Sequence, residues 1–186
     1  MVEIKNLRFA YGENVIFNGL SVTLPERGVV AVTGESGSGK TTLLNVIAGL
    51  IKCEGVTVTG RVAYMFQDNR LLPWLTAAEN VALLSKDGSY AGYLAAVGLS
   101  DEAKKYPSEL SGGEQRRVAF SAATAAEPDI LLLDEPTANL DKENADILRS
   151  IIKTVSGKAL VVIASHSEED VNIAERVIKI GGDNNE

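Results

Sequence analysis

The chain has 186 residues, of which 45% are hydrophobic and 23% are charged, a composition typical of one globular domain and not of a disordered segment. With 18 Lys and Arg against 25 Asp and Glu, its net charge is −7. We therefore expect no nucleic-acid partner, because binding a phosphate backbone needs a concentrated basic surface, although a small phosphate ligand stays compatible with this charge.

The first 24 residues contain two strand patterns. Glu3 to Phe9 and Leu20 to Leu24 alternate apolar and polar residues, which predicts two half-buried strands with the turn Tyr11-Gly12-Glu13-Asn14 between them. We expect these strands to form an antiparallel edge, as an N-terminal β subdomain. Gly28 to Thr33 is then a short apolar strand that runs into a glycine-rich loop, and apolar residues at helical spacing follow up to Leu50. This is a strand, loop and helix unit.

Further apolar runs predict buried strands at Val62 to Phe66, Ile130 to Leu133, Leu160 to Ala164 and Val177 to Ile180. Since helices separate them, we expect an α/β fold with a mostly parallel sheet covered on both faces. Residues 69–126 lack strand patterns and predict helices at Ala77 to Leu84, Tyr90 to Val97 and Glu114 to Ala126, interrupted by Pro107 and Gly112-Gly113. We interpret 69–126 as a helical subdomain inserted into a single domain, 1–186, whose tail from Gly181 frays.

No apolar run is long enough to cross a membrane. The longest runs, such as Ala159 to Ala164, fall far below the roughly 18 residues that a span needs. The start of the chain alternates as Val2-Glu3-Ile4-Lys5 and has no signal-peptide pattern. Its one cysteine, Cys53, allows no internal disulfide. We therefore expect a cytoplasmic protein.

The glycine-rich loop carries the clearest chemical signal. It runs Gly34-Glu35-Ser36-Gly37-Ser38-Gly39-Lys40-Thr41-Thr42 and fits the phosphate-loop pattern G-x-x-x-x-G-K-[ST] at every fixed position. Glycines let backbone N–H groups curl around phosphate oxygens, and the following helix directs its positive end at the same anion. We expect Lys40 to reach the β and γ phosphates and Thr41 to place its hydroxyl on Mg²⁺.

Two adjacent carboxylates, Asp134 and Glu135, end the apolar run that starts at Ile130. Carboxylates at the end of a buried strand are costly without a cation or another partner. In a phosphate-loop protein this is the Walker B position, where Asp134 would hold Mg²⁺ directly or through water and Glu135 would polarise the attacking water as general base. Taken alone, the pair also fits a solvated turn.

A third motif, Leu110-Ser111-Gly112-Gly113-Glu114-Gln115, puts a hydroxyl and two glycines directly before a helix. This suits a second anion at a helix N-terminus and also suits a plain helix cap. With this motif the chain resembles the nucleotide-binding domain of ATP-binding cassette (ABC) ATPases, in which an LSGGQ-like signature lies between the two other motifs. The resemblance covers Val2 to Ile180, although Glu35 stands where the family often has Pro and Ala122 where it often has Arg.

The resemblance implies further site residues. Gln67, after the strand Val62 to Phe66, matches the Q-loop glutamine, which in the family contacts Mg²⁺ and the water and senses the membrane partner. His166 matches the switch histidine that contacts the γ phosphate. Asp141, in Ala138-Asn139-Leu140-Asp141, matches the D-loop that crosses the dimer interface. Tyr11 matches the aromatic residue that stacks on adenine, with an exposed tyrosine at a strand end as the alternative.

The family's mechanism implies partners as well as cofactors. Two cassettes face head to tail, so that ATP and Mg²⁺ on the Lys40 loop of one copy are closed over by Ser111, Gly112 and Gly113 of the other. Transport then requires a separate membrane permease. The run Asp68 to Thr76, which holds the only Trp, is a candidate docking site for it, and the alternative is that this run belongs to the core of the helical subdomain.

The resemblance also bears on the class of transporter. The run after Gln67 resembles that of nitrate, sulfonate and taurine-type importers, whereas Glu135 to Asp141 looks closer to lipoprotein and peptide exporters. An importer would add a solute-binding protein as a partner. We predict the ATP-hydrolysing subunit of a membrane transporter, peripheral on the inner face of the membrane. The alternatives are an ABC ATPase not coupled to transport and a nucleotide-dependent regulatory module with little turnover.

Overall fold

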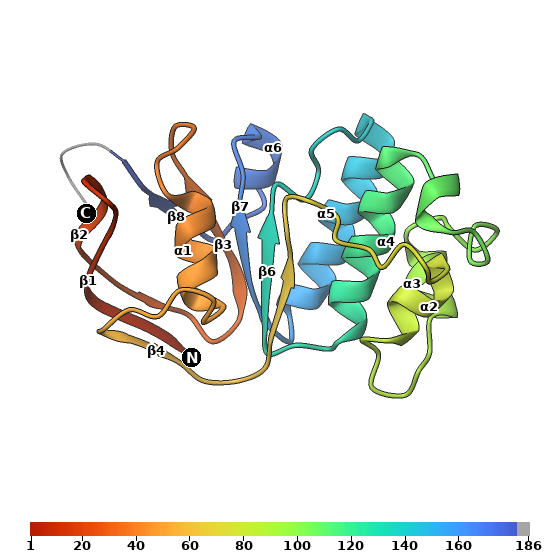
Figure 1. Cartoon of the computed structure of the whole chain (residues 1–186), viewed down its shortest axis with the longest axis horizontal. Helices are drawn as coiled ribbons and strands as arrows, with labels where there is room; N and C mark the ends of the chain where they lie inside the picture. The colour runs from red at the N-terminus through yellow and green to blue at the C-terminus, as the bar shows by residue number, and fades with distance from the viewer. Residues whose placement is uncertain (182–186) are drawn as a thin grey trace.

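Two β-sheets and six α-helices make up residues 1–181, the part of the chain that the computed structural model describes. In Figure 1 the antiparallel sheet lies at one end of the molecule, the parallel sheet lies in the middle, and α2 and α3 lie at the other end. Apart from Gly181, the tail that we expected to fray lies outside the described residues.

The antiparallel sheet has the strand order β2-β1-β4. A hairpin joins β1 (Val2–Tyr11) to β2 (Asn14–Leu24), and β4 (Val56–Val58) pairs with the other side of β1. The predicted antiparallel N-terminal β subdomain is confirmed, and its strands form a sheet of their own. Both strands are longer than predicted, since register shifts in their pairing interrupt the alternation of apolar residues.

The parallel sheet was predicted correctly from its apolar runs. Its strands are β3 (Gly28–Thr33), β5 (Val62–Met65), β6 (Ile130–Asp134), β7 (Leu160–Ala164) and β8 (Arg176–Lys179), in the order β5-β6-β7-β3-β8. All four neighbouring pairs are parallel. The last strand begins one residue earlier than predicted, and β5 ends before Phe66.

Each face of the parallel sheet packs into a different core. Leu132 and Val162 join the core that contains α1 (Lys40–Ile47) and the antiparallel sheet. Their neighbours Leu131 and Val161 join the core formed with the helices on the other face. Burial on both faces explains why these strands are continuous apolar runs and not alternating ones.

The other helices lie on the second face of the sheet or pack against the helices there. They are α2 (Ala77–Ala82), α3 (Ala91–Ala96), a 3₁₀ turn (Pro107–Glu109), α4 (Gly112–Ala125), α5 (Lys142–Ser156) and the short α6 (Glu168–Val171). Residues 69–126 contain helices and turns without a strand, as predicted. Helix α4 starts at Gly112 and not at the predicted Glu114, because Ser111 caps it. Within residues 1–181, no helix is long and apolar enough to cross a membrane.

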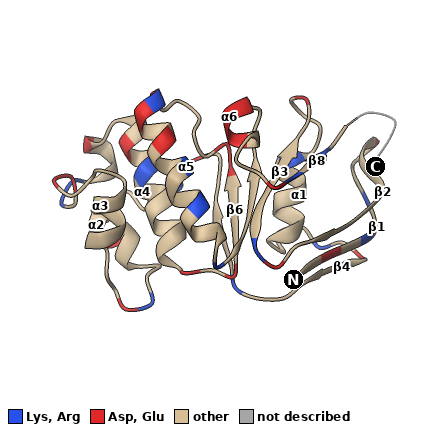
Figure 2. Ribbon diagram, turned by 180° about the vertical axis from the view of Figure 1, so that it is seen from behind, with Lys and Arg blue, Asp and Glu red and all other residues tan. Residues whose placement is uncertain are grey.

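The parallel arrangement places several chain segments at one edge of the sheet. The loops that follow β3, β5, β6 and β7 all leave from the carboxyl ends of these strands, which is where open parallel sheets bind their ligands. Figure 2 shows that the first turn of α6, after β7, is acidic, with Glu168 and Glu169 on the surface. The strands that end at this edge therefore lead into the phosphate loop, Gln67, the pair Asp134 and Glu135, and His166.

Candidate functional site

The glycine-rich loop connects β3 to α1 and depends on two glycines that nothing larger can replace. Gly39 has φ of 104°, and a Cβ there would lie 2.4 Å from Cγ2 of Ile16. A Cβ on Gly34 would lie 2.2 Å from the carbonyl oxygen of Ile180. The loop is thus packed against both the first hairpin and the end of the parallel sheet, and only glycine permits its path.

Within residues 1–181, the side chains of Ser38 and Lys40 make no hydrogen bond to a residue outside this loop. The Lys40 ammonium donates to the carbonyl oxygens of Gly34 and Glu35, at 2.9 Å each. Among the residues that the structure describes, the buried Ser38 hydroxyl has no hydrogen-bond partner, which is costly for a buried polar atom. Glu35 itself is exposed. The loop therefore presents the Lys40 cation at the N-terminus of α1, which suits an anion.

Asp134 is held in place by Thr41, from the other side of the site. The Thr41 hydroxyl donates to Oδ2 of Asp134 at 2.8 Å. Asp134 is only 2% exposed, and this burial raises the pKa of its carboxyl group, with the neighbouring Glu135 adding to the effect. The Thr41 contact and the charges of Arg116 and Lys40 act in the opposite direction. A buried carboxylate of this kind is stabilised by a nearby cation.

Glu135 contacts a different set of groups from its neighbour. Its Oε1 lies 2.8 Å from Nδ1 of His166, and its Oε2 lies 3.3 Å from the hydroxyl of Ser165. The Glu135 side chain is 14% exposed and that of His166 is 76% exposed. The strand end thus sends one carboxylate to the phosphate loop and the next to the loop after β7, so the two carboxylates do not share one partner.

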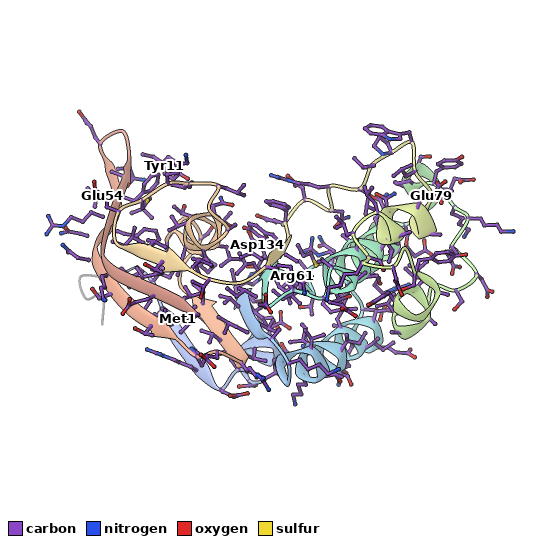
Figure 3. All side chains as sticks on the ribbon, turned by 90° about the horizontal axis from the view of Figure 1, so that it is seen from below. Met1, Tyr11, Glu54, Arg61, Glu79 and Asp134 are labelled. Carbon is purple, nitrogen blue, oxygen red and sulfur yellow. The ribbon has the colours of Figure 1, made fainter. Side chains whose placement is uncertain are left out.

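One cavity collects most of the residues that we expected to bind a nucleotide. It has a volume of about 380 Å³ and is lined by Tyr11, Asn14, Ile16, Ser36, Gly37, Gly39, Lys40, Thr41, Thr42, Gln67, Asp134 and Glu135. Figure 3 shows Tyr11 above the antiparallel sheet and Asp134 near the middle of the molecule. Tyr11 is 53% exposed. A cavity lined by an aromatic side chain, a cation and carboxylates suits a nucleotide, which has an aromatic base and phosphates.

The structure does not bring the signature motif and the D-loop into this cavity. Ser111 caps α4, its hydroxyl accepting from the Glu114 N–H at 3.3 Å while its own N–H donates to Glu114 at 2.7 Å. This contact also lowers the pKa of Glu114. Asp141 caps α5 by accepting from Asn144 at 2.9 Å. A Cβ on Gly113 would lie 3.3 Å from Leu140, so the two motifs adjoin each other instead.

The run Asp68 to Thr76 is folded as a surface turn. Asn80, which is 6% exposed, donates to the carbonyl oxygens of Leu72, Leu75 and Thr76 and accepts from the Leu72 N–H. Trp74, at the top of this turn, is 69% exposed. The alternative that the whole run belongs to the core is therefore wrong, although Leu71 does pack against the core.

Sequence reasoning missed several residues of the site. Asn14 and Ile16 line the cavity because the hairpin turns back over the phosphate loop. Arg116 lies on α4 and contacts the backbone at Glu135, and Asp170 accepts from Ser165 at 2.9 Å. None of the four falls at a fixed position of the three motifs. Only the position of Asn14 beside Tyr11 offered a signal.

These features define a class of protein. A glycine-rich loop between a parallel strand and a helix, with an acidic pair at the end of another strand of the same sheet, is the site of a phosphate-loop nucleoside triphosphatase. The acidic pair lies on β6, two strands from β3 in the sheet. Comparisons with known proteins give the family.

The family model for ABC transporters matches residues 17–138, which is more than half of the chain. The aliphatic sulfonates import ATP-binding protein SsuB 2 of Rhodococcus jostii is 39% identical over 188 residues, covering 95% of this chain and 77% of the relative. The methionine import ATP-binding protein MetN of Brucella abortus is 36% identical over 208 residues, covering 96% of this chain and 56% of the relative.

Solved structures agree with this family. A dimeric bacterial ABC transporter cassette superposes with a TM-score of 0.88 at 30% identity, covering 97% of this chain and 94% of that one. A dimeric cassette in a post-hydrolysis state with ADP and phosphate gives the same TM-score at 28% identity and the same coverage. The chain belongs to the ABC transporter family.

The family confirms the main functional prediction. The chain is an ATP-binding cassette, the subunit of an ABC transporter that binds and hydrolyses ATP. The predicted fold, a phosphate-loop core with an antiparallel sheet and helices, is confirmed by the same structures. The similar cassettes are dimeric and the relatives are import subunits, which implies two kinds of partner, a second cassette and a membrane permease.

Proposed function

We propose that ATP binds in the 380 Å³ cavity and that Glu135 is the general base of its hydrolysis. One observation carries this proposal. The adjacent carboxylates have different partners, Asp134 with the Thr41 hydroxyl and Glu135 with the His166 ring, at 2.8 Å each. Asp134 is thereby bonded to the phosphate loop, whereas Glu135 makes no hydrogen bond with Thr41 and lines the cavity, where it can accept a proton from a water molecule.

The residues around Asp134 fit Mg²⁺. Within residues 1–181, no group of three or more His, Cys, Asp or Glu side chains is arranged to hold a metal ion. The donors here are instead the Thr41 hydroxyl, the Asp134 carboxylate and the Gln67 amide, all of them near the cavity. Mg²⁺ prefers a few protein oxygens together with water and phosphate oxygens. When bound, it would neutralise charge on the phosphates.

Each remaining side chain has a defined part in the reaction. Lys40 exchanges its two loop carbonyls for β and γ phosphate oxygens. Tyr11 stacks on the adenine ring. His166 holds the Glu135 carboxylate through its 2.8 Å contact and reaches the γ phosphate with the exposed part of its ring. Glu135 then takes the proton of the water that attacks the γ phosphate, with Gln67 helping to place that water.

A second copy of the chain completes the site in this proposal. Ser111 and Gly112 are exposed at the N-terminus of the 14-residue helix α4 and lie outside the cavity of their own chain. The Ser111 N–H is occupied by Glu114, so the N–H groups of Gly112 and Gly113, in the first turn of α4, would contact the γ phosphate held by another copy, in a head-to-tail dimer. Asp141 would lie at the same interface. Loss of the γ phosphate removes these bridging contacts, so the dimer opens.

The permease docks on the run Asp68 to Thr76 in this proposal. Trp74 is 69% exposed at the top of a turn that Asn80 holds in shape, and an exposed aromatic residue on a rigid turn suits a protein interface. The relatives named for sulfonate and methionine import support an importer of the nitrate, sulfonate and taurine type, with a solute-binding protein. The cassette would then lie on the inner face of the cell membrane.

The test of this proposal is Glu135→Gln. The amide keeps the shape of the side chain but cannot accept the proton, so we expect ATP hydrolysis to fall by roughly 10³-fold or more. ATP should now hold a stable dimer, seen by size-exclusion chromatography with light scattering. Glu143→Gln, an exposed acid in the first turn of α5, is the control. A Glu135→Gln protein that hydrolyses ATP like the parent would refute the general-base assignment.

A further inference from the structure

Arg116 is a buried arginine whose guanidinium donates only to uncharged oxygen atoms of the site loops. It lies in α4 and is 5% exposed. Its Nε donates to the Pro136 carbonyl at 3.3 Å, Nη1 to the Gln67 carbonyl at 2.6 Å and to Oδ1 of Asn69 at 3.2 Å, and Nη2 to the carbonyls of Asp134 at 2.7 Å and of Glu135. A guanidinium carries five N–H groups, and each of them has an acceptor here.

This arrangement connects three segments that are distant in sequence. The acceptors belong to the loop after β5 and to the strand end and turn after β6, while Arg116 itself follows the signature residue Ser111 by one and a half turns of α4. The guanidinium is planar and its N–H groups point in fixed directions, so it can donate to all five acceptors only while they keep their positions. Arg116 therefore links α4 to the backbone of both loops.

The backbone of Glu135 has an unusual conformation, and hydrogen bonds, including that from Arg116, hold it. Glu135 has φ of 50°, a left-handed conformation that a residue with a side chain rarely adopts. Its N–H donates to the Ala164 carbonyl at 2.8 Å, and its own carbonyl accepts from the Ala138 N–H at 3.1 Å as well as from Arg116. These bonds fix the direction in which the Glu135 side chain leaves the chain, toward His166.

We propose that Arg116 is a positioning residue for hydrolysis, which holds the Glu135 backbone in its left-handed conformation and couples it to the Q-loop and to the signature helix. The inference rests on the proposed role of Glu135 as general base. It adds that the carboxylate reaches its working position only while one guanidinium on α4 holds the carbonyls of Gln67 and Glu135 together. A contact made by the permease near Gln67 or by a second cassette at Ser111 would act on Glu135 through this side chain.

A purely structural role for Arg116 makes a different prediction from a positioning role. Arg116→Lys keeps the charge but replaces the planar fork by one ammonium group, which cannot reach all five acceptors. Asn69→Ala removes a single acceptor and leaves the arginine in place. Val118→Ala is the matched control, since Val118 is fully buried in the same helix and its removal loosens packing without touching these hydrogen bonds.

The experiment measures ATP affinity and steady-state hydrolysis of the full chain, with parent and Glu135→Gln alongside. We expect Arg116→Lys to keep the parental Kd for ATP, because the phosphate loop is untouched, and to lose roughly 10²-fold in kcat, the scale that a misplacement of about 1 Å produces. Asn69→Ala should lower kcat by less, again without a change in Kd, and it reports on the coupling even where Arg116→Lys does not fold. Val118→Ala should retain the parental kcat.

Two results would overturn the inference alone. One is an Arg116→Lys protein with parental kcat, while Glu135→Gln is inactive. The other is a parallel loss of kcat and of ATP affinity in Arg116→Lys and Val118→Ala, which would indicate a merely structural role. If Glu135→Gln hydrolyses ATP like the parent, the proposed function fails first and the inference fails with it.

Discussion

The carboxylate of Asp170 should be one of the most important buried polar groups for stability. It is 1% exposed and accepts hydrogen bonds from the Thr137 hydroxyl at 2.7 Å, the Ser165 hydroxyl at 2.9 Å and Nε of Arg149 at 2.8 Å. These partners come from the turn after β6, the loop after β7 and helix α5. Asp170→Ala removes the one acceptor that all three share.

The size of the effect follows from what each donor loses. Removing one partner of a buried ion pair costs about 3–5 kcal/mol, because the other is left without compensation. Arg149 keeps one acidic partner, since it also donates to the exposed Asp146 at 2.8 Å. We therefore expect Asp170→Ala to lower the free energy of unfolding by about 3 kcal/mol, the lower end of this range. The hydroxyls of Ser165, 1% exposed, and Thr137, 8% exposed, lose a charged acceptor and account for much of it.

Urea unfolding followed by circular dichroism measures this prediction. With a slope of about 2 kcal/mol per molar urea, a loss of about 3 kcal/mol lowers the midpoint by about 1.5 M. Asp146→Ala is the control, because it removes the other, solvent-exposed partner of Arg149 and should cost less than about 1 kcal/mol. A midpoint for Asp170→Ala within about 0.5 M of the parent, or equal to that of the control, would refute the reasoning.

Three further predictions concern the phosphate loop, the docking run and the signature cap. Gly39→Ala should abolish ATP binding in calorimetry and lower the free energy of unfolding by about 1–3 kcal/mol, because φ is 104° and the new Cβ would lie 2.4 Å from Ile16; parental affinity would contradict this. Trp74→Ala should change the free energy of unfolding by less than about 0.5 kcal/mol, since the side chain is 69% exposed, and a larger loss in urea would show that it supports the fold. The Ser111 N–H lowers the pKa of Glu114, so this contact stabilises the fold above the unfolded-state pKa and is lost as the pH falls through the folded-state value. Glu114→Gln should therefore weaken the decrease of Tm from roughly pH 5 to pH 3, and an unchanged decrease would argue against the cap as its source.

Much of the fold could be predicted because its signals are local. A strand buried on both faces must be apolar at every position, so β3, β6 and β7 are visible as runs such as Val29 to Val32. The phosphate loop was predictable for a similar reason. Its glycines are required by its own backbone path and its Lys and Thr by the ligand, so the pattern is complete within nine residues.

Other parts of the fold carried no such signal. Strand β4 has three residues, Val56–Val58, and forms only because β1 offers a free edge, which no local pattern records. Arg116 looks like any polar residue near a helix start, and charged residues there are ordinarily exposed. Its burial depends on acceptors 18 to 49 positions away in the sequence.

The sequence by itself determined the class of this protein, since each motif is a short segment whose residue types follow from the chemistry of a phosphate, a cation or a helix end. What only the tertiary structure decided is how these segments are related. Asp134 contacts Thr41 across 93 positions of sequence, and Glu135 contacts His166 across 31. Such pairs arise because parallel strands bring distant loops to one edge of a sheet. The distances between residues that belong to different motifs are set by the packing of the whole chain, and a local pattern contains no information about them.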